Sequence, residues 1–332
     1  MICSLDDARE RNRLTSFPTA CSGAAQRRTY VLLTAAHNEE SYIEQTIVSV
    51  LSQTVLPSKW IIVSDASVDG TDKIVESYAS KHDFIRFLRV ARPPVRSFGS
   101  KIVALRLGNE LLRDVTYNYI GNMDADIQLD TSYFEDLLAH FENCPRLGIA
   151  SGYVYDRTDH GYRECQTNRT YSVAHGAQLV RKECYQAIGG YAVLQHGGED
   201  WHAQISALMY GWTAEAFPRL HILHNRPTGE GGNLVRYKFR EGRMDYSFGS
   251  DPFFEILKCA QRIPQKPVVL GATARLAGFI WSWLCRERRP VSDEFVAFLR
   301  SDQRRRLMRL FAGSRTMAMG ASGSNNDRLI GI

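Results

Sequence analysis

Four short apolar runs divide the amino-terminal part of the chain, and polar turns or helical patterns follow them. The runs are rich in the β-branched and aromatic residues that favour strands, and they cover residues 29–34, 60–64, 84–88 and 115–120. The first run is continuously apolar, as expected for a strand buried on both faces. Strands that alternate with helices predict a mainly parallel sheet with right-handed crossovers, so we expect an α/β fold.

Acidic residues gather where two of these strands end. Asp65 and Asp69 follow the second run, and Asp124 and Asp126 follow the fourth. In open α/β sheets, ligands bind at the carboxyl ends of the strands. We therefore expect these side chains to line a ligand site at one edge of the sheet. Ser41, which precedes the first helical pattern, is expected to cap that helix.

The pair Asp124 and Asp126 points to a divalent cation. Residues two apart in a strand point the same way, so both carboxylates would face one side. Two hard oxygen donors on one side suit Mg²⁺ or Mn²⁺. The alternative is an ordinary polar turn after a strand, and Asp-x-Asp alone does not decide between them.

Composition and charge exclude several classes of protein. A net charge of +5 over 332 residues is too mild to indicate nucleic-acid binding. The seven cysteines are scattered without a C-x-x-C pair, which favours reduced thiols in a cytoplasmic protein over a zinc site or a disulfide framework. Residues 1–28 lack the apolar run of a signal peptide, and no stretch reaches the ~18 apolar residues of a spanning helix.

Two nucleotide-binding motifs are missing from the sequence. No G-x-G-x-x-G follows the first strand, which argues against a Rossmann dinucleotide site. No G-x-x-x-x-G-K-[ST] occurs, which argues against a P-loop NTPase.

A series of short motifs in a fixed order carries a resemblance to a known family. They are Thr34-Ala35-Ala36-His37-Asn38-Glu39-Glu40, Asp65-Ala66-Ser67-Val68-Asp69-Gly70-Thr71, Gly99-x-Lys101-x-x-Ala104, Asp124-Ala125-Asp126, Gly189-Gly190-Tyr191, Glu199-Asp200 and Gly211-Trp212. In this order the chain resembles glycosyltransferase family 2. The family often has Pro where this chain has Ala35 or Ala36, a departure that removes a rigid turn but no chemical group.

The resemblance implies a fold and a division of the chain. The fold is GT-A, a mainly parallel, Rossmann-like sheet flanked by helices, here with a helical carboxyl-terminal extension. The expected parts are a mobile leader (1–28), a GT-A domain (29–240) with a nucleotide-sugar half (29–130) and an acceptor half (131–240), a helical extension (241–312) and a disordered tail (313–332).

The same resemblance implies the donor site of a metal-dependent enzyme that moves a sugar from a nucleotide diphosphate to an acceptor hydroxyl. The loop from Ala35 to Glu39, which includes Ala36, would wrap the nucleoside, with Glu39 near the ribose. Asp65 can accept a hydrogen bond from a pyrimidine imide, which favours UDP or TDP. Lys101 offers a charge toward phosphate or base; a solvated surface lysine is an equal alternative.

The resemblance also divides the metal ligation among three side chains. Asp126 would bind the Mg²⁺ or Mn²⁺ directly, while Asp124 would hold the ribose or a metal-bound water. His224 would be the third protein ligand. The cation would offset negative charge on the leaving diphosphate.

Residues after position 198 carry the expected acceptor chemistry. Asp200 would be the general base that deprotonates the acceptor hydroxyl for in-line attack, which predicts inversion at the anomeric carbon. Its alternative is a helix-capping carboxylate. Glu199 would orient the site, and Trp201 would stack on a sugar or pack in the core. A polar, Gly-rich stretch at residues 224–232 is expected to act as a lid, with Arg226 on phosphate, and an ordinary surface loop is the alternative.

The carboxyl-terminal part raises the question of a membrane. Arg275 interrupts the apolar stretch 266–285, and a charge is costly inside a bilayer, so we do not expect a spanning helix. Arginines and apolar residues then alternate over 286–311, a pattern that suits an anionic membrane surface. The alternative is a helical tail packed on the core or in a homodimer.

The sequence therefore predicts an inverting glycosyltransferase that acts in polysaccharide or glycan assembly on a saccharide or lipid-linked acceptor. It would be cytoplasmic and peripheral on the inner face of the cell membrane. Two alternatives stay open: a non-catalytic nucleotide-sugar-binding or scaffold protein on the same fold, and a nucleotidylyltransferase. The residues Asp124, Asp126 and Asp200 argue against the first, and the loop 35–40, which is not the Gly-rich loop of a nucleotidylyltransferase, argues against the second.

Overall fold

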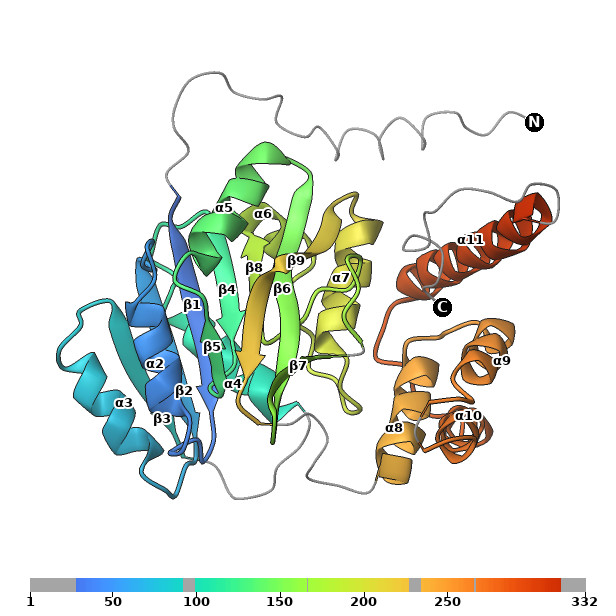
Figure 1. Cartoon of the computed structure of the whole chain (residues 1–332), viewed down its shortest axis with the longest axis horizontal. Helices are drawn as coiled ribbons and strands as arrows, with labels where there is room; N and C mark the ends of the chain where they lie inside the picture. Colours follow the sequence, from blue (N-terminus) through green and yellow to red (C-terminus); the bar gives the residue numbers. More distant parts are fainter. Residues whose placement is uncertain (1–27, 92–98, 166, 227–233, 266, 318–332) are drawn as a thin grey trace, which may run out of the picture.

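A computed structural model of the chain describes residues 28–91, 99–165, 167–226, 234–265 and 267–317, with the side chains of 309–317 excluded. Its centre is one mixed sheet with the strand order β3-β2-β1-β4-β8-β6-β9-β5, in which β7 pairs with β6 (Figure 1). The strands are β1 (Tyr30–Ala36), β2 (Lys59–Asp65), β3 (Ile85–Val90), β4 (Tyr119–Met123), β5 (Ile127–Leu129), β6 (Leu147–Thr158), β7 (Gly161–Glu164), β8 (Ala177–Arg181) and β9 (Thr213–His224).

The sheet changes character halfway across. Strands β3, β2, β1 and β4 run parallel, as the alternating pattern predicts. β8 then pairs antiparallel with both β4 and β6, and β6 pairs parallel with β9. The predicted α/β class is confirmed. The parallel half carries the nucleotide motifs, and the mixed half brings the end of β9 back to the same edge of the sheet.

Helices cover both faces of the sheet. Their bounds are α2 (Ile43–Leu51), α3 (Thr71–Ala79), α4 (Ser100–Glu110), α5 (Tyr133–Asn143), α6 (Lys182–Ala187) and α7 (Glu199–Met209). One core packs α2, α3 and α5 against the sheet, and a second core packs α4, α6 and α7 against the opposite face. Each fully buried Leu, Ile or Phe in them contributes roughly 1.5–3 kcal/mol of transfer free energy, so the two cores hold the site loops on a rigid frame.

The expected cap at Ser41 is wrong. Helix α2 has Tyr42 at its N-cap, and no side chain caps it. The backbone N–H groups of Tyr42 and Ile43 instead donate to the carbonyl of Glu39, at 2.9 and 2.8 Å. A turn in the preceding loop therefore satisfies the first donors, and a side-chain cap is not needed.

Four further helices follow the sheet, and they stand to one side of it (Figure 1). They are α8 (Leu234–Ser247), α9 (Pro252–Gln261), α10 (Leu270–Leu284) and α11 (Asp293–Met317). α8 runs through the position at which the sequence divides domain from extension, and α11 covers the first five residues of the predicted tail. Within the described ranges, we find no helix that is both long and apolar enough to cross a membrane.

Close backbone contacts hold α10 on α8. A Cβ on Gly242 of α8 would collide with the carbonyl oxygen of Arg275, and one on Gly278 of α10 would collide with that of Phe239. A third core cluster, which contains Ile205, Phe248 and Phe295, joins α7 to the end of α8 and to α11. The extension is therefore packed against the helix that begins with Glu199 and Asp200.

Candidate functional site at the carboxyl edge of the sheet

The loop that carries Asp124 and Asp126 is fixed by its neighbours. It lies between β4 and β5, and its Asp124 N–H donates to the carbonyl of Gly176 at 2.7 Å. The buried hydroxyl of Thr46 donates to two carbonyls of the same loop, of Ala125 at 2.8 Å and Ile127 at 2.9 Å. Packing and backbone hydrogen bonds thus set the positions of both carboxylates.

The loops after β1 and β2 are tied to each other. The Asn38 N–H donates to Ser67 Oγ at 3.1 Å, and the Val68 N–H donates to Asn38 Oδ1 at 2.9 Å. The Asp69 carboxylate accepts from the backbone N–H of Thr71 at 3.1 Å, which closes an Asx-type turn before α3. Asn38 and Ala66 have positive φ angles of 54° and 57°. Non-glycine residues held in this region cluster at ligand sites.

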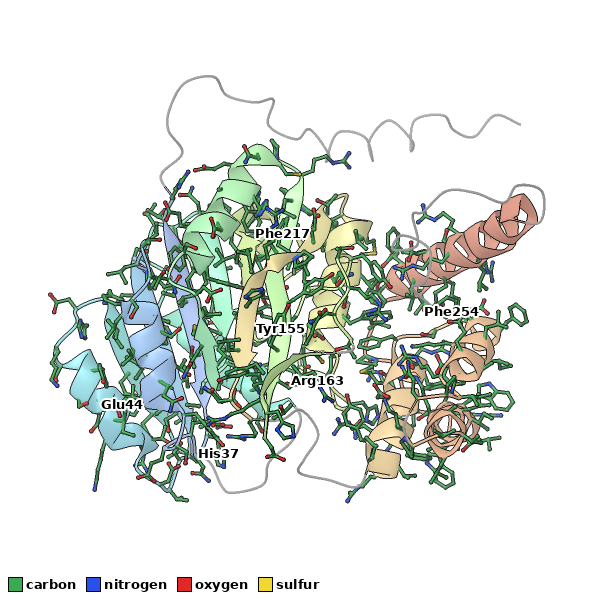
Figure 2. All side chains as sticks on the ribbon, viewed as in Figure 1. His37, Glu44, Tyr155, Arg163, Phe217 and Phe254 are labelled. Atoms are coloured by element: carbon green, nitrogen blue, oxygen red, sulfur yellow. The ribbon has the colours of Figure 1, made fainter. Side chains whose placement is uncertain are left out.

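Ala36 and Asp65 occupy the ends of β1 and β2, beside these loops. A residue that the sequence interpretation missed lies between them: His37 Nδ1 is 2.5 Å from the carbonyl oxygen of Asp65. Figure 2 shows His37 at the carboxyl edge of the sheet. A histidine next to the motif residues Asn38 and Glu39 was a visible signal.

Lys101 and Asp124 form an ion pair, so Lys101 lies in the site and is not a solvated surface lysine. Burial disfavours the charged amine, but the Asp124 carboxylate outweighs it and raises the pKa of Lys101, with Glu199 and Asp126 adding to the effect. Burial raises the pKa of Asp124, and the charge of Asp126 adds to it, against the lowering effect of Lys101. The Lys101 ammonium group therefore interacts electrostatically with several carboxylates.

His224, at the end of β9, lies between two carboxylates. Its Nε2 is 3.3 Å from Asp126 Oδ2, and its Nδ1 is 2.9 Å from Asp156 Oδ1. Burial opposes protonation, but hydrogen bonds to Asp126 and Asp156 raise the pKa of His224 to about 10. Burial would raise the pKa of Asp126, but His224 and Arg226 bring it below its usual value.

Asp156 is the second residue that the sequence interpretation missed. It stands opposite His224 where β6 pairs with β9, although the two residues are 68 positions apart. The strand pattern in the sequence covers residues 148–155 and ends one residue before Asp156, whereas β6 continues to Thr158. The parallel register of β6 and β9 brings the two residues together, and no pattern within either segment of the sequence predicts that register.

Arg226 follows β9 and returns to the first loop. It forms an ion pair with Glu39, and its Nε is 3.7 Å from Asp126 Oδ2. Its guanidinium also lies over the Tyr42 ring, 5.3 Å from the centroid. Of the predicted lid, residues 224–226 are described, and residues 227–232 lie outside the described residues.

Glu199 and Asp200 form the first turn of α7, where the helix dipole favours negative charge. Asp200 Oδ1 accepts from the Trp201 N–H at 2.7 Å. Burial raises the pKa of Asp200, and Asp124 adds to the effect, while the Trp201 N–H and Lys101 oppose it. Burial also raises the pKa of Glu199. Trp201 itself packs on Phe248, with ring centroids 4.8 Å apart, which is the core-packing alternative.

The donor groups present fit a divalent cation that shares its ligands with a substrate. No group of three or more His, Cys, Asp or Glu side chains in the described part of the chain forms a complete metal cage. Mg²⁺ is typically held by one or two carboxylates plus substrate phosphates. An incomplete set of protein ligands is therefore the expected arrangement. Asp126 supplies one such carboxylate, His224 would add an imidazole nitrogen beside it, and Asp156 would orient the His224 ring from its other nitrogen.

The structure thus brings nearly all the predicted site residues to one edge. Around Lys101, Arg226 and His224 it gathers more acidic groups than basic ones, namely Glu39, Asp124, Asp126, Asp156, Glu199 and Asp200. Such an excess of carboxylates can hold a cation and act as a proton acceptor, and the basic groups can contact a phosphate.

Half of the chain matches one family model. A family model described as "Glycosyl transferase family 2" matches residues 32–197 of the 332. The poly-beta-1,6-N-acetyl-D-glucosamine synthase of Staphylococcus epidermidis is 32% identical over 122 residues, which are 36% of this chain and 27% of that protein. The chain therefore matches little more than a quarter of this relative's length.

Two solved structures share the fold. GalNAc-T7 with UDP, GalNAc and Mn²⁺ has a TM-score of 0.52 at 15% identity, over 79% of this chain and 58% of that one. S. aureus TarS 1-349 has a TM-score of 0.50 at 13% identity, over 87% of each chain.

Proposed function

Because the chain belongs to glycosyl transferase family 2, we propose that the carboxyl edge of its sheet transfers a sugar from a nucleotide diphosphate to an acceptor hydroxyl. One observation carries this proposal. The ion pair of Lys101 with Asp124 lies close enough to α7 that both residues act electrostatically on Asp200. The end of β4 and the first turn of α7 therefore face each other across one site, as donor and acceptor binding would require.

The donor is a nucleotide sugar with a pyrimidine base, UDP or TDP. Asp65 would accept from the imide N–H of the base, beside Ala36 and the tied loops. Glu39 and Asp124 would hold the ribose, and Lys101 and Arg226 would contact the diphosphate. The name of the relative from S. epidermidis supports an N-acetylhexosamine as the transferred sugar.

Asp126 and His224 would hold a divalent cation, Mg²⁺ or Mn²⁺, at the diphosphate. When bound, the cation would offset charge on the leaving group. Asp156 would keep the His224 ring in place from its other nitrogen.

Asp200 is the proposed general base. Burial raises its pKa, so the carboxylate takes up a proton more readily than an exposed aspartate. Deprotonation of the acceptor opposite the leaving diphosphate gives in-line attack and inversion. Glu199, in the same turn, would orient the acceptor, whereas Trp201 packs against the extension.

The proposed acceptor is a saccharide or lipid-linked saccharide in polysaccharide assembly. We place the enzyme at the inner face of the cell membrane, bound peripherally. Arginines of the extension support this placement, since they suit an anionic lipid surface.

Thermal unfolding with a panel of nucleotide diphosphates and their sugars, with Mn²⁺ or with a chelator, tests the donor site. A ligand at a concentration one hundred times its Kd should stabilise the folded protein by about 2.7 kcal/mol. We expect this stabilisation only when a pyrimidine nucleotide and the metal are both present. Asp126→Ala should abolish the effect, whereas the exposed neighbour Asp130→Ala should retain it. Equal stabilisation by purine nucleotides, or full stabilisation of Asp126→Ala, would overturn the donor assignment.

A further inference from the structure

Helix α10 exposes an uncharged stripe to solvent. Its exposed residues recur at helical spacing, and they are Leu270, Thr273, Ala277, Ile280, Trp281, Trp283 and Leu284. The exposed fractions of Trp281 and Leu284 are 54% and 64%. Large apolar side chains in one row on a surface mark a contact with another molecule or a membrane.

Helix α9 continues this surface. Phe253 and Ile256 point outward from it with exposed fractions of 57% and 52%. In Figure 1, α9 and α10 lie on the side of α8 that faces away from the sheet. The apolar surface of α9 and α10 is therefore remote from the catalytic edge and belongs to the extension alone.

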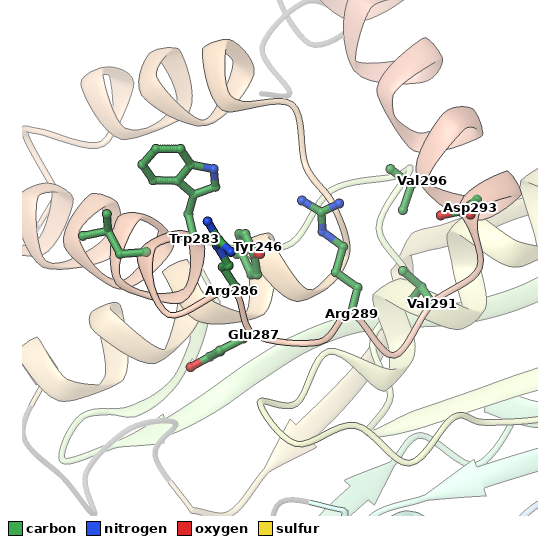
Figure 3. A pocket seen from close by; sticks show the side chains of 9 residues that line it. Tyr246, Trp283, Arg286, Glu287, Arg289, Val291, Asp293 and Val296 are labelled. Atoms are coloured by element: carbon green, nitrogen blue, oxygen red, sulfur yellow. The ribbon is translucent and has the colours of Figure 1, made fainter.

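A cleft of about 710 Å³ lies at the end of this surface, along the segment that connects α10 to α11. Figure 3 shows Trp283, Arg286 and Arg289 extending to the same side of the connecting segment. Val291 and Val296, with Asp293, line the part of the cleft next to α11. The cleft thus combines two guanidinium groups with aromatic and aliphatic walls.

The two arginines are held in unusual ways. Arg289 lies over the Tyr246 ring, 4.9 Å from the centroid, and its buried Nε has no hydrogen-bond partner among the described residues. Arg286 has a left-handed backbone with φ of 49°. A buried donor left without a partner and a strained residue both cost free energy, and such costs are concentrated at binding sites.

Two carboxylates, Glu287 and Asp293, line the cleft beside the two arginines, and Glu287 is engaged elsewhere. Glu287 pairs with Arg243 at 2.5 Å and accepts from Ser282 Oγ at 2.8 Å. It also lies 3.6 Å from His196, in the segment that leads to Glu199 and Asp200. Glu287 thus ties the floor of the cleft to the loop before α7, on the acceptor side of the enzyme.

We propose that the cleft of Arg286 and Arg289 binds the phosphate of an anionic lipid while the α9–α10 surface rests in the bilayer interface. Guanidinium groups suit phosphate, and tryptophans suit the headgroup region. The arginine cluster that follows the apolar stripe complements an anionic surface, which favours a membrane over a protein partner. This inference rests on the proposed function and gives it a specific membrane-facing side.

Flotation with phosphatidylcholine vesicles, with and without phosphatidylglycerol, tests the inference on the full chain. The variant Arg286→Gln/Arg289→Gln should bind anionic vesicles about 25-fold more weakly, at roughly fivefold per arginine near the surface. Trp281→Ser/Leu284→Ser should lose binding as well. The matched control Arg86→Gln/Arg113→Gln removes two exposed arginines of the sheet domain and should bind like the wild type.

Two further arms separate the alternatives. Arg304→Gln/Arg305→Gln removes exposed charge from α11, and loss of binding in this variant alone would assign the membrane side to α11 and overturn the inference. Inorganic phosphate should compete weakly with vesicles; a complete block by low phosphate would indicate a soluble phosphate ligand instead. The thermal shift with nucleotide and Mn²⁺ should be unchanged in Arg286→Gln/Arg289→Gln, so failure of this inference and failure of the donor site are distinguishable.

Discussion

Two clusters of buried charge in this molecule differ in how completely they are neutralised. The extension cluster surrounds Arg275, which contacts Asp245, Glu255 at 3.1 Å and Glu241 at 2.8 Å. Lys258 adds a second cation, 2.8 Å from Asp245. The site cluster at the sheet edge has Lys101 as the one ammonium group among its described carboxylates, aided by Arg226 and His224.

The pKa directions follow this difference at most of the carboxylates, and there are two exceptions: the pKa of Glu255 in the extension cluster is raised by burial and by Asp245, and that of Asp126 in the site cluster is lowered by His224 and Arg226. Burial would raise the pKa of Asp245, but Arg275 and Lys258 lower it to about 2. In the site cluster, burial prevails and the pKa values of Asp124, Glu199 and Asp200 are raised. A buried carboxylate with its full set of partners serves the fold, whereas one that lacks them remains available to a cation or a proton.

The largest effect is expected from Asp245→Asn. This change removes one of the two carboxylates, Asp245 and Glu255, that the buried Arg275 and Lys258 share, which should lower the free energy of unfolding by about 3–5 kcal/mol. Urea denaturation measures it. Glu142→Gln, which breaks the exposed pair with Arg28, is the control and should cost about 0–1 kcal/mol. Similar losses in the two variants would erase the contrast between the extension cluster and a surface pair.

The same chemical change at Asp200 should affect the transfer rate and not the stability of the fold. Asp200→Asn should lower the transfer rate by roughly 10²–10⁴-fold, the usual contribution of a general base. Its free energy of unfolding should stay equal or rise, because a buried charge is removed from an acidic site. Sugar transfer assays and urea denaturation on one preparation test both halves. An Asp200→Asn variant that is destabilised but active would contradict this, because Asp200 would then serve the fold and not the transfer.

Packing in the extension gives the next effect. Gly242→Ala should destabilise α8 and α10 by about 3 kcal/mol, because the new methyl group would meet the Arg275 carbonyl and push the helices apart. Gly176→Ala, where the nearest atoms lie 3.7 Å from a new Cβ, should be nearly neutral in stability. Circular dichroism on thermal unfolding compares them; equal melting temperatures would show that the α8–α10 contact does not hold the extension cluster together.

Sequence reasoning succeeded where chemistry was local and failed where it depended on register. The order of strands and motifs predicted the α/β fold and placed Asp65, Asp124 and Asp126 at strand ends. Asp156 was missed because its contact with His224 depends on the pairing of β6 with β9. The sequence marks Arg275 as a charge inside an apolar stretch, but its carboxylate partners come from α8 and α9. No periodicity in one segment shows what another segment presents to it.

The smallest predicted effect is the pH dependence of the extension cluster. The folded pKa of Asp245 is about 2 and the unfolded value is about 3.9, so its contribution is present above pH 4 and is lost as the pH falls toward 2. The amount is about 2.6 kcal/mol, because the two pKa values differ by about 1.9 and each unit corresponds to about 1.4 kcal/mol. The difference in free energy of unfolding between the wild type and Asp245→Asn, measured by urea denaturation from pH 6 downward, isolates it. That difference should be constant above about pH 4 and should shrink below it. A difference that stays constant down to pH 2 would mean that Asp245 is not held ionised by Arg275 and Lys258, and the two clusters would then share one electrostatic character.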